Sequence, residues 1–314
     1  MKYLITGHSG FVGKYLIDYI LQMEANAEII GLDIASTTHK HENLQEFVVN
    51  LLEIEKLNSI LSDLKPDYII HLASFSSVAY SWQYPIESFR NNTNIFLNLL
   101  EAIHKFSPET KLLSIGSSEE YGAVRVDDLP LKETLKPRPL SPYAVARVAQ
   151  ENMSRVYSKG FGLNIICTRS FNHIGCGQED KFVISSLAKR FADFKAGKCS
   201  EISIGNTSII RDFLDVRDVV RAYYMLLKSD AGGSEVFNIC SGRQTSIQDI
   251  IDMFKKITGT NPPLAVDENL LRPVENSIVV GSNQKINELC GWEPEIELED
   301  SLKALAVWWQ GKAN

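Results

Sequence analysis

The sequence lacks the features that would place the protein in a membrane, secreted or disulfide-rich class. It has no apolar run of about 18 residues that could cross a bilayer, and no long apolar signal segment follows Met1. Its five cysteines are odd in number and widely spaced, with no Cys-x-x-Cys pair, which argues against a disulfide framework and a cysteine metal site. We therefore expect a cytoplasmic protein in a reducing compartment, with no membrane partner and no metal.

Positive charge is also scarce. The chain carries 32 Lys and Arg against 39 Asp and Glu, a formal net charge of −7. This balance argues against a general affinity for nucleic acid, although a local cationic pocket can still bind an anionic ligand. The 314 residues, 44% hydrophobic and 23% charged, have the composition of a globular protein with one large or two small domains. We expect no nucleic-acid partner.

Short apolar runs alternate with amphipathic stretches from Met1 to about Arg169. This order predicts βαβ units, and so an α/β fold with a Rossmann-type doubly wound parallel sheet. The predicted strands are 2–6, 28–32, 46–50, 67–72, 111–116 and 163–169. The predicted helices are 10–24, 53–64, 85–106 and 143–159. Residues 117–142 are rich in proline and charge and predict a loop over the carboxyl ends of the strands, where open α/β sheets bind ligands.

The pattern changes after residue 172, where helices dominate. They are predicted at 181–195, 216–229, 246–257 and 299–310, with short strands between them. We expect residues 1–170 to form a dinucleotide-binding domain that includes the catalytic residues. Residues 171–314 are expected to form mainly a smaller mixed α/β cap that binds the substrate, with some segments returning to the sheet. The segments 75–84 and 174–182 are expected to be loops.

A glycine-rich turn joins the first predicted strand to the first predicted helix. It contains Gly7, Gly10, Phe11, Val12 and Gly13. Glycines let the backbone approach a pyrophosphate, whose charge the helix N-terminus stabilises. Asp33 ends the second strand 20 residues after Gly13, where an acid can accept hydrogen bonds from the adenosine ribose. Its charge would repel a 2′-phosphate, so NAD(H) is favoured, and NADP(H) remains the alternative. A turn residue is the other interpretation of Asp33.

The next two strands end in residues that suit cofactor contact. Asn50 and Leu51 end the third predicted strand, where an amide can hydrogen-bond the adenine edge. Leu72 and Ala73 end the fourth strand and Ser74 follows, and we assign all five residues to the cofactor site. His71 is interpreted as a buried histidine satisfied within the sheet, because its neighbours are strand residues, and not as a catalyst.

Tyr143 and Arg147 lie four residues apart, which places them on the same face of a helix. A fixed cation beside a phenol stabilises the phenolate, so the pair is a candidate proton-transfer device. Ser117 and Ser118 follow the fifth strand and could hydrogen-bond a substrate oxygen, which would complete a site for reducing a carbonyl or oxidising an alcohol beside nicotinamide. The alternatives are a tyrosine at a helix start with an arginine on the solvated face, and serines that serve turn geometry.

These motifs resemble those of the extended short-chain dehydrogenase/reductase family over almost the whole chain. The glycine spacing, residues 71–73, Ser117 with Ser118 and the Tyr143 segment carry the resemblance. Within the family the chain is most similar to nucleotide-sugar enzymes, the GDP-4-keto-6-deoxymannose reductases that form GDP-rhamnose. That likeness rests on the stretches 117–122, 169–175, 211–218 and 271–275.

The resemblance implies roles for individual residues. Ser117 would orient the substrate oxygen, Tyr143 would act as the acid, and Arg147 would stand where the family has a lysine that also contacts the nicotinamide ribose. The implied substrate-binding residues are Ser77, Ser118, Asn172, Arg211, Arg272 and Glu275. The chain departs from the family also at Asn50, where Asp is usual, at Phe75, commonly polar, and at Cys176, usually Pro. These departures affect the expected substrate more than the expected fold.

Several functions compete at this point. The leading hypothesis is an NAD(P)H-dependent reductase of a 4-keto-6-deoxy nucleotide sugar, with a GDP-linked sugar favoured. A GDP-hexose 4,6-dehydratase with Glu119 as base is the second, and a 4-epimerase a smaller alternative. A dinucleotide-binding protein with little turnover is a different class, motivated by Arg147 alone. The resemblance also implies a homodimer formed through residues 85–106 and 143–159.

Overall fold

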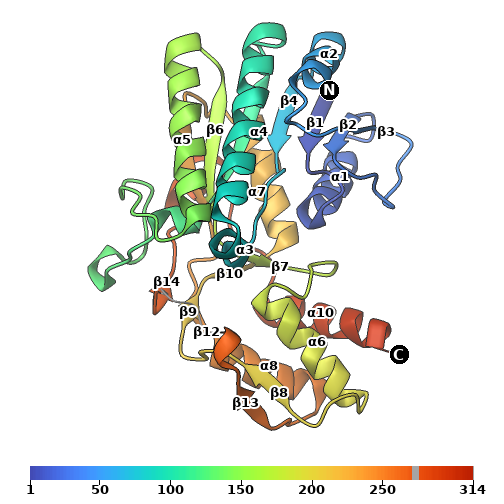
Figure 1. The fold of residues 1–314 in the computed structure, drawn as a ribbon, viewed down its shortest axis with the longest axis vertical. Coiled ribbons are helices and arrows are strands. Elements are labelled where there is room, and N and C mark those ends of the chain that lie inside the picture. The colour runs from blue at the N-terminus through green and yellow to red at the C-terminus, as the bar shows by residue number, and fades with distance from the viewer. Residues whose placement is uncertain (271–275, 314) are drawn as a thin grey trace.

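A seven-stranded parallel sheet forms the upper half of the molecule (Figure 1). The computed structural model describes residues 1–270 and 276–313. The sheet strands are β1 (Lys2–Thr6), β2 (Glu28–Asp33), β3 (Leu44–Val48), β4 (Tyr68–His71), β5 (Lys111–Ser117), β6 (Ile165–Ser170) and β11 (Glu235–Ile239). Their order is β11-β6-β5-β4-β1-β2-β3, and every neighbouring pair is parallel. The order reverses between β1 and β4, the position where such sheets bind ligands outside the strand ends. The predicted Rossmann-type fold is confirmed.

Alternating side chains of each strand give the sheet two apolar faces. In β1, Tyr3 and Ile5 join one core cluster and Leu4 joins the other, as the two-residue period of a strand requires. The helices α1 (Phe11–Met23), α7 (Val216–Lys228) and α9 (Gln284–Cys290) cover the first face. The helices α2 (Ile54–Leu64), α4 (Pro85–Phe106) and α5 (Pro142–Phe161) cover the second. Both faces are therefore buried, which explains the continuous apolar runs of the strands.

The start of α5 is fixed by a Ser-Pro pair. Ser141 is the N-cap and its Oγ accepts a hydrogen bond from the Ala144 backbone N–H at 3.1 Å. Pro142 occupies the first helical position, where its fixed φ suits the helix and its missing N–H costs nothing. Tyr143 follows as the second helical residue, so the sequence itself places this side chain at the helix start, beside the carboxyl ends of the strands.

The lower half of the molecule is a smaller unit of helices and short strands (Figure 1). Three helices share one core with Phe191 and Phe254 at its centre: α6 (Val183–Lys195), α8 (Ile247–Thr258) and α10 (Leu298–Ala313). The short strands are β7 (Asn172–Ile174), β8 (Ile202–Ile204), β9 (Ile210–Arg211), β10 (Phe213–Asp215), β12 (Thr245–Ser246), β13 (Leu264–Val266) and β14 (Ile278–Val279). Strand β7 pairs with β10 and strand β9 with β14, both in parallel and outside the seven-stranded sheet.

Two predicted segments differ from the structure. The third strand is Leu44–Val48, two residues earlier than predicted, because its register with β2 begins at Leu44; Asn50 therefore lies beyond the strand. The segment 75–84, predicted to be a loop, contains the short helix α3 (Val78–Gln83), which Ser77 caps through a hydrogen bond from the Tyr80 N–H to its Oγ at 3.1 Å. Residues 117–142 contain the 3₁₀ turns η1 (Ser118–Tyr121) and η2 (Val126–Asp128), and η3 (Glu268–Leu270) lies near the C-terminal part.

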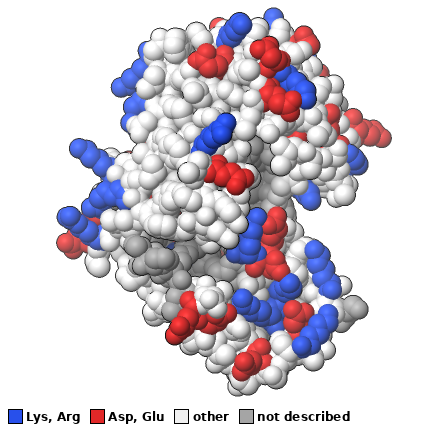
Figure 2. Space-filling model, in the orientation of Figure 1, with Lys and Arg blue, Asp and Glu red and all other residues white. Residues whose placement is uncertain are grey.

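Charged side chains of both signs are mixed on the surface, as the composition of the chain leads one to expect. On the face in Figure 2, Lys and Arg are interspersed with Asp and Glu over both halves. Within residues 1–270 and 276–313, no helix combines the length and the apolar character that crossing a bilayer requires.

Candidate active site

The glycine turn needs its glycines for steric reasons. Gly7 has φ +74°, and a Cβ there would lie 2.8 Å from the backbone N of Ala73. A Cβ on Gly13 would lie 2.4 Å from the carbonyl oxygen of His8. Gly10 is the N-cap of α1, with no capping side chain and no acidic residue in the first turn. The N–H groups and dipole of α1 are thus well suited to a pyrophosphate.

The Asp33 side chain lies against this turn. Its Oδ2 accepts hydrogen bonds from the Ser9 N–H at 3.1 Å and from Ser9 Oγ at 2.7 Å. Its Oδ1 accepts from the Ile34 N–H at 2.7 Å. These bonds hold the carboxylate at the carboxyl end of β2, next to the glycines. A contact of Asp33 with a cofactor ribose stays a prediction.

The other predicted cofactor residues separate into exposed and buried positions. Asn50 is exposed, and its Oδ1 accepts from the Leu52 N–H at 3.0 Å. The Leu51 side chain packs in the second core cluster with residues of α2 and α4, and its carbonyl accepts a hydrogen bond from Asn98 Nδ2 at 2.9 Å. Phe11 stacks on His173 of β7 at 6.2 Å between ring centroids, and Val12 packs on the first core cluster. Leu72 and Ala73 follow β4 closely, and the Leu72 N–H still donates to the Thr6 carbonyl.

Tyr143 and Arg147 are both buried and in direct contact. Their exposed fractions are 6% and 5%, and Arg147 Nε donates to the Tyr143 hydroxyl oxygen at 3.2 Å. The guanidinium also lies 5.2 Å from the centre of the Tyr143 ring. The alternative that Arg147 lies on a solvated face is therefore wrong, because α5 packs this face against β5. A cation within hydrogen-bond distance of a phenol stabilises the phenolate.

Three more of the five N–H donors of Arg147 are bound by the protein. Nη1 donates to the Ile115 carbonyl at 3.0 Å and to Gln150 Oε1 at 2.6 Å, and Nη2 donates to Ser74 Oγ. Gln150 Nε2 in turn donates to Ser114 Oγ at 2.8 Å and to the Ile115 carbonyl at 3.0 Å. The guanidinium is consequently held in one orientation. Sequence reasoning missed Gln150, although its spacing of seven residues from Tyr143 placed both on one helix face.

Ser117 lies at the end of β5 and begins the turn η1. Its Oγ accepts from the Glu119 N–H at 3.2 Å, while its own N–H donates to Glu120 Oε1 at 2.8 Å. The serine does serve turn geometry, yet its hydroxyl hydrogen is left to donate to a substrate oxygen. Because α5 packs against both β5 and η1, Ser117 and Tyr143 lie in the same region of the strand ends.

A buried charge cluster lies behind Ser117. Arg169 pairs with Glu151 through Nε at 2.9 Å and Nη2 at 3.1 Å, whereas Glu120 Oε2 is 3.9 Å from Arg169 Nε. Burial first, and the neighbouring Glu151 second, raise the pKa of the Glu120 carboxyl to about 8. One guanidinium serves two carboxylates, so Glu120 holds a proton at neutral pH. Sequence reasoning did not single out this cluster.

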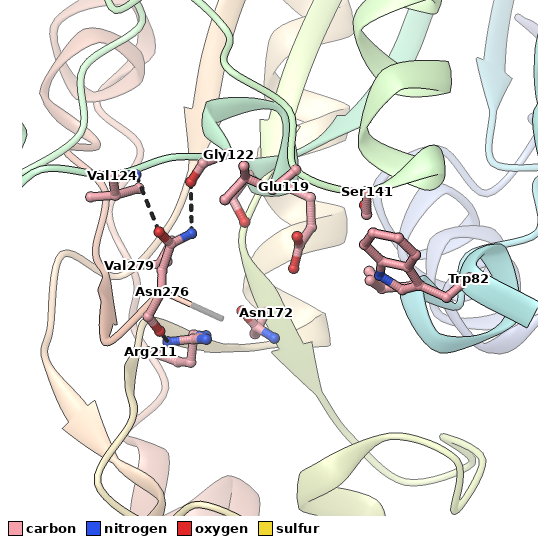
Figure 3. A pocket seen from close by; sticks show the side chains of 12 residues that line it. Trp82, Glu119, Gly122, Val124, Ser141, Asn172, Arg211, Asn276 and Val279 are labelled. Atoms are coloured by element: carbon pink, nitrogen blue, oxygen red, sulfur yellow. Dashed lines mark hydrogen bonds between the residues drawn. The ribbon is translucent and has the colours of Figure 1, made fainter. Parts of the chain in front are cut away.

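A pocket opens in front of η1, between the two halves of the molecule (Figure 3). Glu119 points into it from the sheet side, and Asn172 and Arg211 face it from the opposite wall. Arg211 Nη1 donates to the carbonyls of Ile210 at 2.8 Å and of Asn276 at 3.0 Å. The structure thus brings together three residues that come from three separate stretches of sequence. Ser118 also lines the pocket.

Several lining residues were not predicted. Trp82 of α3 and Leu140 form part of the wall, and Asn276 bridges two loops by donating to the Gly122 carbonyl at 2.6 Å and accepting from the Val124 N–H at 3.2 Å (Figure 3). No local sequence signal marks these positions, because they meet only after the lower half folds onto the strand ends. The predicted substrate residues Arg272 and Glu275 lie outside the described residues.

His71 is buried in the sheet as predicted, but it is only half satisfied, because its Nε2 has no hydrogen-bond partner among the described residues. The ring is 1% exposed, and its Nδ1 shares a hydrogen bond with Thr6 Oγ1 at 2.9 Å. Burial, aided by the charge of Arg147, lowers the pKa of His71 to about 3. The imidazole is therefore neutral at physiological pH and belongs to the sheet interior.

Comparison with known proteins identifies the setting of this site. Residues 4–305 match the family model described as GDP-mannose 4,6 dehydratase. The GDP-6-deoxy-D-mannose reductase of Pseudomonas aeruginosa is 33% identical over the whole chain and 98% of its own length. The solved structure of RMD from Pseudomonas aeruginosa complexed with NADPH has a TM-score of 0.87 at 33% identity, covering 99% of both chains. The UDP-glucose 4-epimerase of Thermus thermophilus complexed with NAD has a TM-score of 0.87 at 25% identity, also over 99% of both chains.

Proposed function

Because this chain belongs to the GDP-mannose 4,6-dehydratase family of extended short-chain dehydrogenases/reductases, we propose that it reduces a 4-keto-6-deoxy nucleotide sugar. GDP-4-keto-6-deoxymannose is the favoured substrate. The observation that carries the proposal is the buried contact of Tyr143 with Arg147 in α5, which packs against the strand end that carries Ser117. A relative of 33% identity that is a GDP-6-deoxy-D-mannose reductase supports the choice of sugar.

The residues of the site divide the reaction between them. A bound reduced nicotinamide supplies the hydride that reaches C4 of the sugar. Ser117 donates a hydrogen bond to the keto oxygen and so orients it. Tyr143 gives its phenolic proton to that oxygen, which becomes the C4 hydroxyl, and Arg147 stabilises the phenolate left behind. Water then restores the proton of Tyr143.

The pocket in front of η1 suits the nucleotide diphosphate of such a substrate. Arg211 supplies a positive charge beside the neutral amide of Asn172, and a guanidinium can bind phosphate oxygens through two parallel hydrogen bonds. Arg272 and Glu275 are proposed to complete the diphosphate and ribose contacts, as the family resemblance implies.

We propose NAD(H) as the preferred cofactor, because the Asp33 carboxylate at the end of β2 would repel a 2′-phosphate. NADP(H) is the alternative, since the related structure from Pseudomonas aeruginosa is complexed with NADPH. The ratio of kcat/KM for NADH and NADPH decides between them.

The test is the absorbance at 340 nm of purified protein with GDP-4-keto-6-deoxymannose and either cofactor. We expect oxidation of NADH, and a loss of at least about a hundredfold in kcat for Tyr143→Phe, the range of a lost acid catalyst. If neither NADH nor NADPH is oxidised across a panel of GDP- and UDP-linked keto sugars while the protein binds NAD, the reductase hypothesis is wrong. The hypothesis of a dinucleotide-binding protein with little turnover then replaces it.

A 4,6-dehydratase is the second candidate, and one observation favours it: Glu119, in the place of the dehydratase base, points into the pocket. A dehydratase would convert GDP-mannose to a 4-keto product with no net change in the cofactor, and NMR would detect that product. A 4-epimerase, which would use the same Ser117 and Tyr143, would instead invert the C4 hydroxyl. A reductase retains NADH oxidation in Glu119→Gln, whereas a dehydratase loses its turnover.

A homodimer is proposed through α4 and α5. Both helices carry exposed apolar side chains, which are Ile86, Phe89, Leu97, Val145, Val156 and Phe161. Burying them against a second copy would remove apolar area from water. Light scattering during gel filtration should give twice the 35.2 kDa chain mass, and a charged substitution such as Val156→Glu should shift it toward the monomer.

A further inference from the structure

A cluster of two histidines and one aspartate lies at the far edge of the sheet. The connection between β2 and β3, at the right of Figure 1, brings His39 and His41 against Asp18 of α1. Asp18 Oδ1 is 2.7 Å from His39 Nε2 and 2.9 Å from His41 Nε2, and the two ring nitrogens are 2.9 Å apart. Among the described residues this is the one group of three such side chains whose ligand atoms converge.

Hydrogen bonds alone cannot satisfy all three contacts. An ionised carboxylate only accepts, so each Nε2 must carry a proton to bond Asp18. The two protonated nitrogens would then face each other as donor and donor at 2.9 Å. If one of them loses its proton, its lone pair faces the carboxylate oxygen instead. With an ionised Asp18 and no metal ion, one of the three contacts among Asp18 Oδ1, His39 Nε2 and His41 Nε2 is therefore always repulsive.

A cation at this position satisfies all three lone pairs at once. With metal bonds of about 2.1 Å, ligand atoms about 2.8 Å apart subtend roughly 85° at the metal, close to the facial arrangement of two histidines and one carboxylate. The side chains of Asp18, His39 and His41 are 51%, 30% and 31% exposed, so water can occupy the remaining positions. We propose that Asp18, His39 and His41 bind a divalent first-row transition-metal ion.

Hydrogen bonds that do not involve the ring nitrogens of His39 and His41 fix the conformation of the loop between β2 and β3. The His39 N–H donates to Thr37 Oγ1 at 3.0 Å, and the Thr37 N–H donates to Glu46 Oε1 of β3 at 2.9 Å. Thr37 itself is buried, 4% exposed. The two imidazole rings contact edge to face at 4.6 Å. The metal would fasten residues 34–43, which follow Asp33 directly, to α1.

The proposed metal site differs from the prediction made from the sequence, which was that the protein binds no metal. That expectation considered cysteine spacing, whereas the signal here is a His-x-His pair in a loop and an acid that is distant in sequence. The cluster takes no part in the proposed reaction, so failure of the proposed reductase activity would leave it untouched.

Calorimetry with Zn²⁺ tests the site, because this ion has no geometric preference from its d electrons. The full chain is used untagged and metal-free, in a Cys199→Ser background that removes the exposed thiol. We expect one ion per chain, at least about tenfold weaker binding in His39→Ala, His41→Ala and Asp18→Asn, and unchanged binding in His104→Ala, an exposed histidine elsewhere. Absent Zn²⁺ binding, or binding that survives the double variant His39→Ala/His41→Ala, would overturn the proposal.

Hydrogen exchange gives a second, independent readout. Zn²⁺ should slow amide exchange in residues 34–43 by about tenfold or more in the parent protein, because binding to the folded loop opposes its opening. The same addition should leave exchange in His39→Ala unchanged. Equal exchange with and without Zn²⁺ in the parent protein would contradict fastening of the loop.

Discussion

Removing the charge of Arg147 should slow the reaction about a thousandfold. At an effective dielectric constant of about 20, a full charge about 4 Å from the phenolate contributes roughly 4 kcal/mol, which equals three decades in rate. The contact of 3.2 Å from Nε to the Tyr143 oxygen, with both residues buried, supports the use of this value. Arg147→Gln and Arg147→Met both remove this charge.

The two neutral variants separate chemistry from folding. Arg147→Met leaves Gln150 Oε1 without its donor, at a cost of about 1 to 3 kcal/mol for a buried group, whereas the Ile115 carbonyl keeps the hydrogen bond from Gln150 Nε2. Arg147→Gln keeps a donor amide and should cost less stability. We expect kcat to fall similarly in both, whereas the urea midpoint falls more in Arg147→Met.

Arg147→Lys is the matched control. It keeps the charge beside Tyr143 but cannot bond Ser74, Ile115 and Gln150 through a planar fork, so we expect kcat within about tenfold of the parent. The assay is NADH oxidation under saturating substrate, with circular dichroism to confirm folding. A folded Arg147→Gln protein that keeps more than about a tenth of the parent kcat would refute the electrostatic role.

Three further predictions follow from neighbouring groups. The pKa of Glu120 in the folded protein lies above its ordinary value, so its contribution to stability is complete below about pH 4.5 and is lost as the pH rises through about 8. The urea midpoint of the parent protein should therefore fall between pH 6 and 9. The free energy of unfolding of Glu120→Gln should fall by at least about 1 kcal/mol less than that of the parent over the same pH range. An equal fall in both proteins would contradict the buried proton beside Arg169 and Glu151. Asp33→Asn should raise kcat/KM for NADPH relative to NADH by about tenfold, because the charge that repels a 2′-phosphate is gone, and an unchanged ratio would argue against that contact. Gln150→Leu should lower kcat by about tenfold with little change in KM, since Gln150 only positions the guanidinium, and a change confined to KM would count against this role.

Much of the fold could be predicted because its signals are local. The Gly7 turn, the Ser141-Pro142 helix start and the apolar strands each follow from nearby residues, and each predicted helix lies within a few residues of an observed one, although the short helices α3 and α9 were not predicted. The register of β3 could not be read in this way, since pairing with β2 selects it.

The site was predictable only in part. Tyr143, Ser117 and Arg211 belong to motifs that can be recognised in the sequence. Asn276 and Trp82 carry no such motif and reach the pocket through the packing of the two halves. Likewise, no spacing rule connects Asp18 to His39, because α1 and the β2–β3 loop meet only in the folded chain.

The transfer of deuterium tests the central claim most directly. Protein, GDP-4-keto-6-deoxymannose and NADH carrying deuterium at the transferable C4 position are mixed, and the product sugar is analysed by NMR. The account predicts deuterium at C4 of the sugar with one NADH oxidised for each product formed, and transfer at least about a hundredfold slower in Tyr143→Phe. A product without deuterium at C4, or equal transfer in Tyr143→Phe, would contradict it.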